Sequence, residues 1–353
     1  MQRVFLGPTE ITDFVIDWPR VVSQTSEIGQ VAIADIPSLT GDNTRNFWEV
    51  ENPSSPFYGA DLRESEITLF QDGALVFDGA IQNIRVDESG HTAEVLLRSR
   101  AQKALDDGII YVSGQTTPLE KGTPADLAIE ICELYNIQWD AGSFALSNAY
   151  YNFAELEVRG RIIAPGTTLL AALQALATIG TARVWFEANI LYWQAWQPGG
   201  APPIVEFNDD IEAVECTLLS RPTPEQIEKQ EVRGYSVTWE GGPPAEIGLQ
   251  DGAFTVDGGP QSIFPIATLS SAVWVGGQWL AYLSRPQNRI TFNVPIGYAR
   301  ELKLGDPVAV RNFSGRWAEA RVIDITMLDT STLVQGTISG VTRVDLGEEP
   351  LSA

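Results

Sequence analysis

The spacing of the apolar residues changes twice along this chain, and this change constrains the fold more than any other feature of the sequence. Short apolar alternations run up to about residue 100, apolar residues at helical spacing follow up to about residue 200, and strand-like alternation then returns. A period near two indicates strands, and a period near 3.6 indicates amphipathic helices. The sequence therefore predicts β-structure on both sides of an α+β unit.

The first segment, residues 1–100, has the pattern of short antiparallel strands. An apolar run at 67–81 is interrupted at its middle by Asp-Gly, which predicts a hairpin closed by a tight turn. A further strand is expected at 92–97, and residues 40–59, rich in Ser, Asn and Pro, predict a long loop. Strands this short between turn signals favour a small antiparallel barrel or sandwich.

The second segment contains two helices with clear ends. Thr123 supplies an N-cap ahead of a proline, and apolar residues at helical spacing follow it. The other helix begins near Thr168, presents a stripe of leucines and ends at Gly180. The apolar runs at 182–195 then predict a hairpin that turns at Ala188 and Asn189.

The third segment follows a Pro- and Gly-rich stretch at 198–203, which indicates a linker. Residues 223–229 are expected to form a helix-friendly turn, and the polar, glycine-rich residues 241–286 an insertion with a short helix at 275–283. Strand-like alternation lies on both sides of this insertion, at 212–219, 232–239, 289–294, 306–310, 318–325 and 332–341.

The expected fold class is mainly β with α+β, in which two small antiparallel barrels flank an α+β domain. We expect the first barrel at 1–100, the α+β domain at 101–200, and the second barrel at 201–240 and 287–346. The insertion at 241–286 would interrupt the second barrel. Several packed units are expected because a single hydrophobic core rarely grows beyond about 250 residues, and this chain has 353.

Acidic side chains outnumber basic ones two to one. The chain carries 46 Asp plus Glu against 23 Lys plus Arg, a formal net charge of -23. The net charge is -9 in residues 1–100, -5 in 101–200 and -9 in 201–353, so the negative charge is spread along the whole chain and is not confined to a tail. Such a surface repels phosphate, which argues against free nucleic acid as a ligand; solubility is the other explanation.

The sequence predicts neither membrane insertion nor a disulfide framework. No apolar run reaches the roughly 18 residues of a membrane span, and the first residues lack a signal core, so we expect synthesis in the cytoplasm. Cys132 and Cys216 lack the spacing of a zinc site or of paired cysteines, which favours two free thiols.

Catalytic motifs are absent from the sequence. His91 is the single histidine and lies in a polar turn, so Ser-His-Asp catalysis, Cys-His catalysis and a zinc site all lack support. No phosphate-binding or dinucleotide-binding glycine motif occurs. We therefore expect no catalytic, metal-binding or cofactor-binding residues and no cofactor.

Two groups of carboxylates leave alternatives open. Asp106 and Asp107, and the run Asn208, Asp209 and Asp210, are the densest clusters, and both lie where Asp and Asn commonly cap turns. Calcium binding or acid-base work by a carboxylate pair remains the alternative to this structural role.

Five of the ten tryptophans have surroundings that suggest a role. Trp185, Trp193 and Trp239 lie in expected strands beside other aromatic residues, where core packing is the ordinary explanation. Trp18 and Trp48 have less regular surroundings and are candidates for contacts between subunits. An exposed tryptophan face that binds sugar is the alternative.

The order of four sequence elements resembles that of the phage tail-hub family, which is related to baseplate hubs and tail-tip proteins. The elements are the hairpin at 70–81, the helix start at 123–129, the helix at 166–173 that precedes an aromatic hairpin, and the strand entry Leu-Lys-Leu-Gly-Asp-Pro-Val at 302–308. Each element is weak alone, and their order carries the resemblance.

This resemblance implies a homotrimer in which two tube-like barrels per chain form a six-barrel ring. Such a hub would close the tail tube at the virion tail tip, below a distal tail or tail tube protein, above a fibre or spike, and in contact with the tape measure protein. Genomic DNA would pass through an acidic channel without specific binding. Two other functions remain open: a carboxylate-dependent glycosidase or peptidoglycan hydrolase, and a carbohydrate-binding adhesin.

Overall fold

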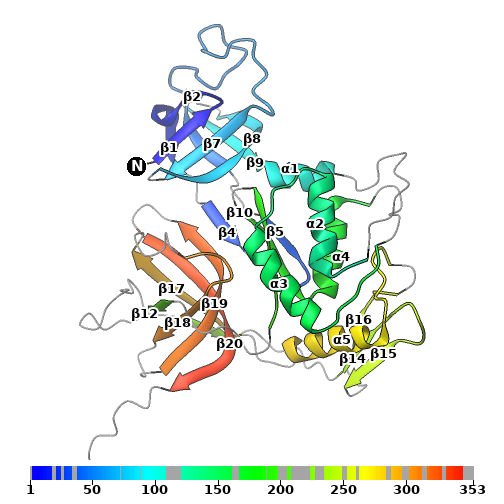
Figure 1. Cartoon of the computed structure of the whole chain (residues 1–353). Coiled ribbons are helices and arrows are strands. Elements are labelled where there is room, and N and C mark those ends of the chain that lie inside the picture. The colour runs from blue at the N-terminus through cyan, green and yellow to red at the C-terminus, as the bar shows by residue number, and fades with distance from the viewer. Residues whose placement is uncertain are drawn as a thin grey trace, which may run out of the picture.

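The computed structural model describes most of the chain as three packed units (Figure 1). The described residues are 2–17, 21–24, 28–33, 38–71, 73–87, 89–108, 121–160, 167–187, 189–197, 205–207, 223–226, 234–248, 253–259, 262–283, 288–295, 302–311, 316–327 and 331–344. Two curled β-sheets and a helical unit around a small sheet make up this part. The predicted fold class, mainly β with α+β, is confirmed.

The first sheet is seven-stranded and curls around its own core. Its strand order is β2 (Thr9–Glu10), β1 (Gln2–Leu6), β7 (Glu66–Gln71), β8 (Ala74–Val86), β9 (Thr92–Ser99), β6 (Ser38–Asp42) and β3 (Val15–Asp17), with a short 3-10 helix at Thr12–Phe14. The expected hairpin is β7–β8, where Gln71 pairs with Ala74 across a turn that holds Gly73 at a φ of 86°. Such a positive φ suits glycine, which has no Cβ.

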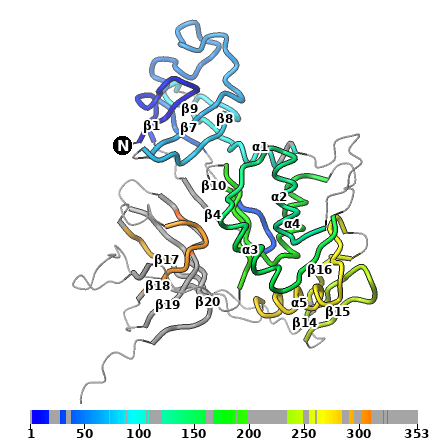
Figure 2. The backbone as a smooth tube through the Cα atoms, in the orientation of Figure 1, coloured from blue at the N-terminus to red at the C-terminus, as the bar shows by residue number. Residues whose placement is uncertain are grey.

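The chain leaves the first sheet before completing it. Strand β4 (Val21–Gln24) pairs with β19 of the third unit, and β5 (Val31–Ile33) pairs in parallel with β10 of the helical unit. Figure 2 shows β5 beside β10, although these strands are far apart in sequence. The expected first barrel at 1–100 therefore includes two strands that belong to other sheets, because apolar alternation identifies a strand but not its partner.

The helical unit packs α3 and α4 against a small sheet of order β11-β10-β5, with α2 against both of these helices and α1 against α4. The helices are α1 (Arg100–Asp107), α2 (Pro124–Leu134), α3 (Ala141–Phe153) and α4 (Leu169–Ile179), and the strands after them are β10 (Ala182–Glu187) and β11 (Ile190–Ala195). Thr123 caps α2 in a capping box, Thr168 caps α4, and α4 ends at Gly180, as the sequence predicted. Helices α1 and α3 were not expected, and Asp106 and Asp107, which the sequence placed in a turn, are the last two residues of α1.

A further three-stranded sheet packs on the helical unit. It consists of β15 (Ala245–Gly248), β14 (Gly234–Val237) and β16 (Ala253–Val256), covered by α5 (Leu269–Leu283). Its apolar residues belong to the same core as the helices, and Trp279 Nε1 donates to the backbone oxygen of Thr178 at 2.9 Å. The strand expected at 232–239 as part of the second barrel is therefore β14 of this sheet.

The third unit is the second curled sheet. Its strand order is β12 (Val205–Phe207), β18 (Pro307–Arg311), β19 (Arg316–Met327), β20 (Ser331–Val344), β17 (Asn288–Pro295) and β13 (Thr223–Gln226), with β4 beside β19. Strand β13 stands where a helix-friendly turn was expected. The linker at 198–203 and the strand at 212–219 lie outside the described residues.

No helix in the described ranges is long and apolar enough to cross a membrane.

Candidate functional site

The β10–β11 hairpin contacts all three units and is the structural centre of the molecule. Its two strands pair in register from Ala182 with Ala195 to Glu187 with Ile190. Because side chains alternate along a strand, the hairpin presents two faces. One face packs on the helices, the other packs on the second curled sheet, and the turn contacts the first sheet.

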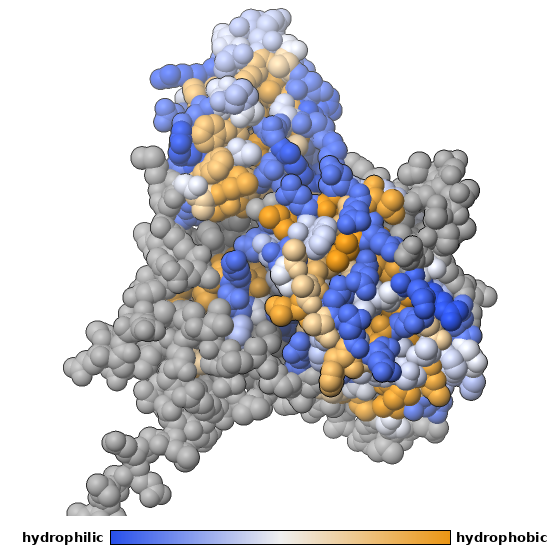
Figure 3. Space-filling model, in the orientation of Figure 1, coloured by the Kyte–Doolittle hydropathy of each residue, from blue (hydrophilic) through white to orange (hydrophobic). Residues whose placement is uncertain are grey.

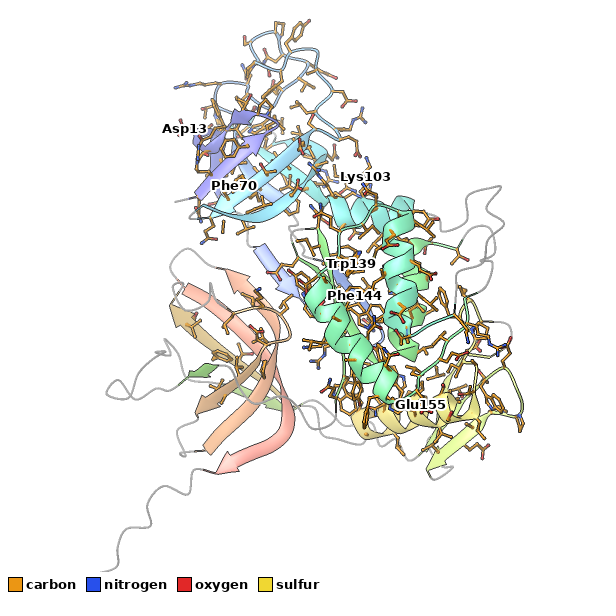
Figure 4. The ribbon with its side chains drawn as sticks, viewed as in Figure 1. Asp13, Phe70, Lys103, Trp139, Phe144 and Glu155 are labelled. Atoms are coloured by element: carbon orange, nitrogen blue, oxygen red, sulfur yellow. The ribbon has the colours of Figure 1, made fainter. Side chains whose placement is uncertain are left out.

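The face toward the helices is fully buried. Trp193 is 0% exposed, and its indole Nε1 donates to the hydroxyl of Tyr151 at 3.1 Å, which in turn donates to the backbone oxygen of Gly180 at 2.8 Å. Burial raises the Tyr151 pKa far above its usual range, so this hydroxyl remains a donor. Figure 4 shows Trp139 and Phe144 together near the start of α3, where their rings meet edge to face at 5.4 Å.

The opposite face joins the hairpin to the second curled sheet. Trp185 is 3% exposed and lies in the same apolar cluster as Phe292 and Val308 of that sheet. Its ring stacks on Tyr192 of the neighbouring strand, with centroids 5.4 Å apart and planes at 9°. This stacked pair is the apolar contact that joins the two units.

A polar contact lies beside the stacked pair. Gln194 Nε2 donates to the backbone oxygen of Gly305 at 3.2 Å. Gly305 has a φ of 84°, and a Cβ there would come within 2.9 Å of the Gln194 amide. Glycine suits this loop because of its positive φ, whereas the Gln194 side chain could move to admit a Cβ.

The hairpin turn connects to the first sheet through Asn189. Its Oδ1 accepts from the backbone N–H of Ala101 at 3.0 Å, and its Nδ2 donates to Asp78 Oδ2 at 2.9 Å. Asp78 also pairs with Arg100 Nε at 3.1 Å. Burial raises the pKa of Asp78, and the hydrogen bond from Asn189 opposes that rise.

The sequence predicted this hairpin but not its role as a junction. The signal was present, since Val184, Trp185 and Phe186 form a continuous apolar run in one strand and Leu191, Tyr192 and Trp193 in the other. A strand that is apolar on both faces is buried on both faces.

A cleft of about 500 Å³ lies at the seam between α3, the hairpin and the loop at 302–306. Its walls include Leu146, Tyr192 and Leu304, and its charged groups are Asp140, Glu187, Lys303 and Asp306. The pKa of Glu187 is raised chiefly by burial, while Lys303 lowers it and Asp306 raises it.

The outward face of α3 continues from this cleft. Leu146 is 74% exposed and Phe153 is 90% exposed, with Ala149 exposed between them. Figure 3 shows apolar side chains along α3 on the face toward the viewer. Apolar side chains gathered on one exposed face commonly mark a contact with another molecule.

The described residues contain no reactive constellation. The backbone N–H of His91 donates to Asp87 Oδ1 at 3.0 Å within a polar turn. In the same turn, hydrogen bonds from Ser89 and Thr92 lower the pKa of Asp87 to about 2. Cys132 is buried, and burial raises its pKa to about 12, so it is a protonated thiol at neutral pH.

Metal-binding groups of three or more His, Cys, Asp or Glu are absent from the described ranges. The side chains of Asp106 and Asp107 lie outside what the structure describes, as do residues 208–210 and Cys216. The alternatives raised for these carboxylates therefore remain predictions.

Trp48 is not a subunit contact. It is 1% exposed in the core of the first sheet, and its backbone N–H donates to Asn43 Oδ1 at 2.9 Å. Asn43 itself is fully buried, and its Nδ2 donates to the backbone oxygen of Gly90 at 3.0 Å, so the long loop is anchored to the sheet. Irregular backbone around a tryptophan does not imply exposure. Trp18 lies outside the described residues.

The other tryptophans mostly follow the sequence-based interpretation. Trp185 and Trp193 are buried in β10 and β11. Trp239 lies just beyond the end of β14, is partly buried, and donates from Nε1 to the backbone oxygen of Pro243 at 2.8 Å. Core packing, together with the junction described above, accounts for these three side chains.

Two solved structures of tail proteins share this fold. A tail protein from Neisseria meningitidis MC58 matches with a TM-score of 0.58 at 15% identity, over 97% of each chain. A 43 kDa tail protein of prophage MuSo2 from Shewanella oneidensis matches with a TM-score of 0.57 at 10% identity, over 97% of this chain and 99% of that chain. The fold is that of these tail proteins.

The similarity extends over the whole tail-protein fold, since both comparisons cover nearly the full length of each chain. No family model matches the sequence, and no curated protein matches it either. The resemblance to phage tail proteins inferred from short sequence elements is thus confirmed at the level of fold.

Proposed function

We propose that this chain is a structural, non-enzymatic component of a phage-type tail. The observation that carries the proposal is the tail-protein fold, shared over the full length of two solved structures. The three-way junction at the β10–β11 hairpin supports it, because Asn189, Trp185 and Gln194 fix the units to one another. A rigid, multi-unit body is what an assembly component requires.

Within the tail, we propose that the chain forms the trimeric hub that closes the tail tube. The two curled sheets of each chain would supply six tube-like elements per trimer, which matches a six-fold tube above and a three-fold fibre or spike below. Its further partners would be a distal tail or tail tube protein and the tape measure protein. The protein would then reside at the virion tail tip after assembly in the host cytoplasm.

The acidity of the chain has a role in this proposal. A net charge of -23, spread over the whole sequence, would make the lumen of such a ring acidic. An acidic lumen repels the DNA backbone and lets the genome pass without binding.

Mass measurement and electron microscopy test the proposal together. Purified protein should show three times the 38.6-kDa chain mass by light scattering, and class averages should show a ring with a central channel. Mass spectrometry of purified tail particles should contain the chain. A stable monomer that is absent from tail particles would refute the proposal.

A further inference from the structure

The seam cleft and the outward face of α3 form one continuous surface. Leu146 belongs to both, because it lines the cleft and is 74% exposed on the helix. Phe153 lies seven residues further along the same helix, which places it about 10 Å away along the axis at 1.5 Å per residue. A partner that covers the helix face thus reaches the cleft as well.

The cleft has the chemistry to take a cationic side chain. Three carboxylates, those of Asp140, Glu187 and Asp306, line it against one lysine, Lys303. Asp140 is partly occupied as the N-cap of α3, since its Oδ1 accepts from Ser143 N at 2.7 Å. Among the described residues no hydrogen bond to the Glu187 carboxylate is found, and this carboxylate is largely buried.

The walls of the cleft suit arginine in particular. Its planar guanidinium pairs with carboxylates and stacks on aromatic faces, while its alkyl stem packs on apolar side chains. Tyr192, Leu146 and Leu304 supply such walls around Glu187.

A different chain is the better source of this cation than a second copy. This protein has two acidic side chains for each basic one. Several of its described basic side chains, including Arg3, Arg100 and Lys121, already form ion pairs within the chain. A more basic partner would also reduce the repulsion that assembling such acidic chains creates.

We propose that α3 and the seam cleft dock a segment of a different tail protein that lays apolar side chains on Leu146 and Phe153 and inserts an arginine beside Glu187. This inference rests on the proposed function, since it names the chemistry of one neighbour in the tail. The arginine stem packs on Leu146 and Leu304, and the apolar neighbours in the segment cover the rest of the α3 face.

Methyl NMR of the full chain tests the cleft without requiring tail assembly. The probes are the blocked peptide acetyl-Leu-Arg-Leu-Leu-amide and its counterpart with neutral citrulline in place of arginine. Saturable shifts are expected at the methyls of Leu146 and Leu304 and none at Leu69, which is buried in the first sheet. The arginine peptide should bind roughly tenfold more tightly, a difference of about 1.4 kcal/mol.

Two variants make this titration specific. Glu187→Gln should abolish the preference for arginine, and it should fold normally because the amide preserves the size of a carboxyl that is already largely buried. Glu246→Gln removes an exposed carboxyl on β15 and should leave the preference unchanged. Equal binding of both peptides to the unmodified protein, or no saturable shift up to about 10 mM peptide, overturns the inference.

Photo-crosslinking in purified tail particles identifies the source of the segment. p-Benzoylphenylalanine in place of Phe153 should crosslink to a different protein, within a few residues of an arginine. The control places the same group at Tyr58, an exposed residue of the first unit, where it should not crosslink to that arginine-containing segment. A crosslink to a second copy, or none at Phe153 in particles that contain the chain, overturns the inference and leaves the proposed function standing. Absence of the chain from particles refutes the proposed function itself, whereas the NMR result judges the cleft independently.

Discussion

Replacing Trp185 with alanine should separate the second curled sheet from the rest of the molecule. Trp185 is 3% exposed and lies at the seam, in a cluster with Phe292 and other residues of that sheet. A buried tryptophan removes roughly 200 Å² from water, which at about 25 cal/mol per Å² amounts to about 5 kcal/mol. Because the unfolded chain already buries part of this area, the expected loss is about 3–5 kcal/mol.

The location of this loss distinguishes it from ordinary core damage. Trp185→Ala removes the side chain that joins two units, so the second sheet should open while the helices stay folded. Hydrogen exchange followed by mass spectrometry should show faster exchange in β17 to β20 and unchanged exchange in α2 and α4. Calorimetry should show a new transition at lower temperature.

Trp193→Ala is the matched control. Trp193 belongs to the same hairpin and is 0% exposed, but it faces the helices. Its loss should speed exchange in α3 and α4 instead, because its contacts with Tyr151 and Phe144 disappear. If both variants gave the same exchange pattern, or if Trp185→Ala cost less than about 1 kcal/mol, the junction role assigned to Trp185 would be wrong.

Three further perturbations test individual contacts. Asn189→Ala removes the partner of Asp78, and chemical denaturation should show a loss of about 1.5–3 kcal/mol, the usual value for a hydrogen bond to a charged group. Gly41→Ala places a Cβ 2.1 Å from Trp48 Nε1, and the same assay should show a loss of about 1–3 kcal/mol from overpacking. The pKa of Asp87 is lowered from 3.8 to about 2. The ionised carboxylate therefore stabilises the folded protein above pH 3.8, and this stabilisation is lost as the pH falls toward 2. Asp87→Asn should make thermal stability less dependent on pH between these two values.

Each of these perturbations has its own control. Asn189→Gly retains the positive φ of the turn but loses the side-chain bonds, so it should be destabilised nearly as much as the alanine variant. Gly277→Ala adds a Cβ with nothing within 4 Å in a helix, and should stabilise the protein by up to about 1 kcal/mol. Thr92→Val removes one donor to Asp87 and should raise the pKa of that carboxyl, measured by NMR titration.

Features fixed by local contacts could be predicted from the sequence. The ends of α2 and α4 depend on Thr123, Thr168 and Gly180, which satisfy backbone groups within one turn. Helix α3 was missed because its buried stripe includes Ser147 beside Phe144 and lacks a clear apolar period. Ser147 bonds across to the hairpin, where its hydroxyl donates to the Trp193 backbone oxygen at 3.0 Å.

Features fixed by distant pairing could not be predicted. The apolar alternation at 232–239 indicated the strand β14, but the sheet that it joins depends on partners elsewhere in the chain, as do the sheets that β4 and β5 join. The apolar runs of β10 and β11 signalled burial on both faces, but they could not show that the second curled sheet covers the face of Trp185 and Tyr192. The cleft likewise brings together residues of α3, the hairpin and the loop at 302–306.

The early departure of the chain from the first sheet has a consequence for synthesis on the ribosome. Val31 pairs with Val184, and Val21 pairs with Met327, so strands that emerge first must wait for partners that emerge much later. Pairings of such long sequence separation form slowly and leave strand edges exposed meanwhile. The first sheet, whose own strands all lie within residues 2–99, can form early, but β4 and β5 must wait for their partners. Fragments that end before β19 should therefore expose β4 and be captured by chaperones or aggregate.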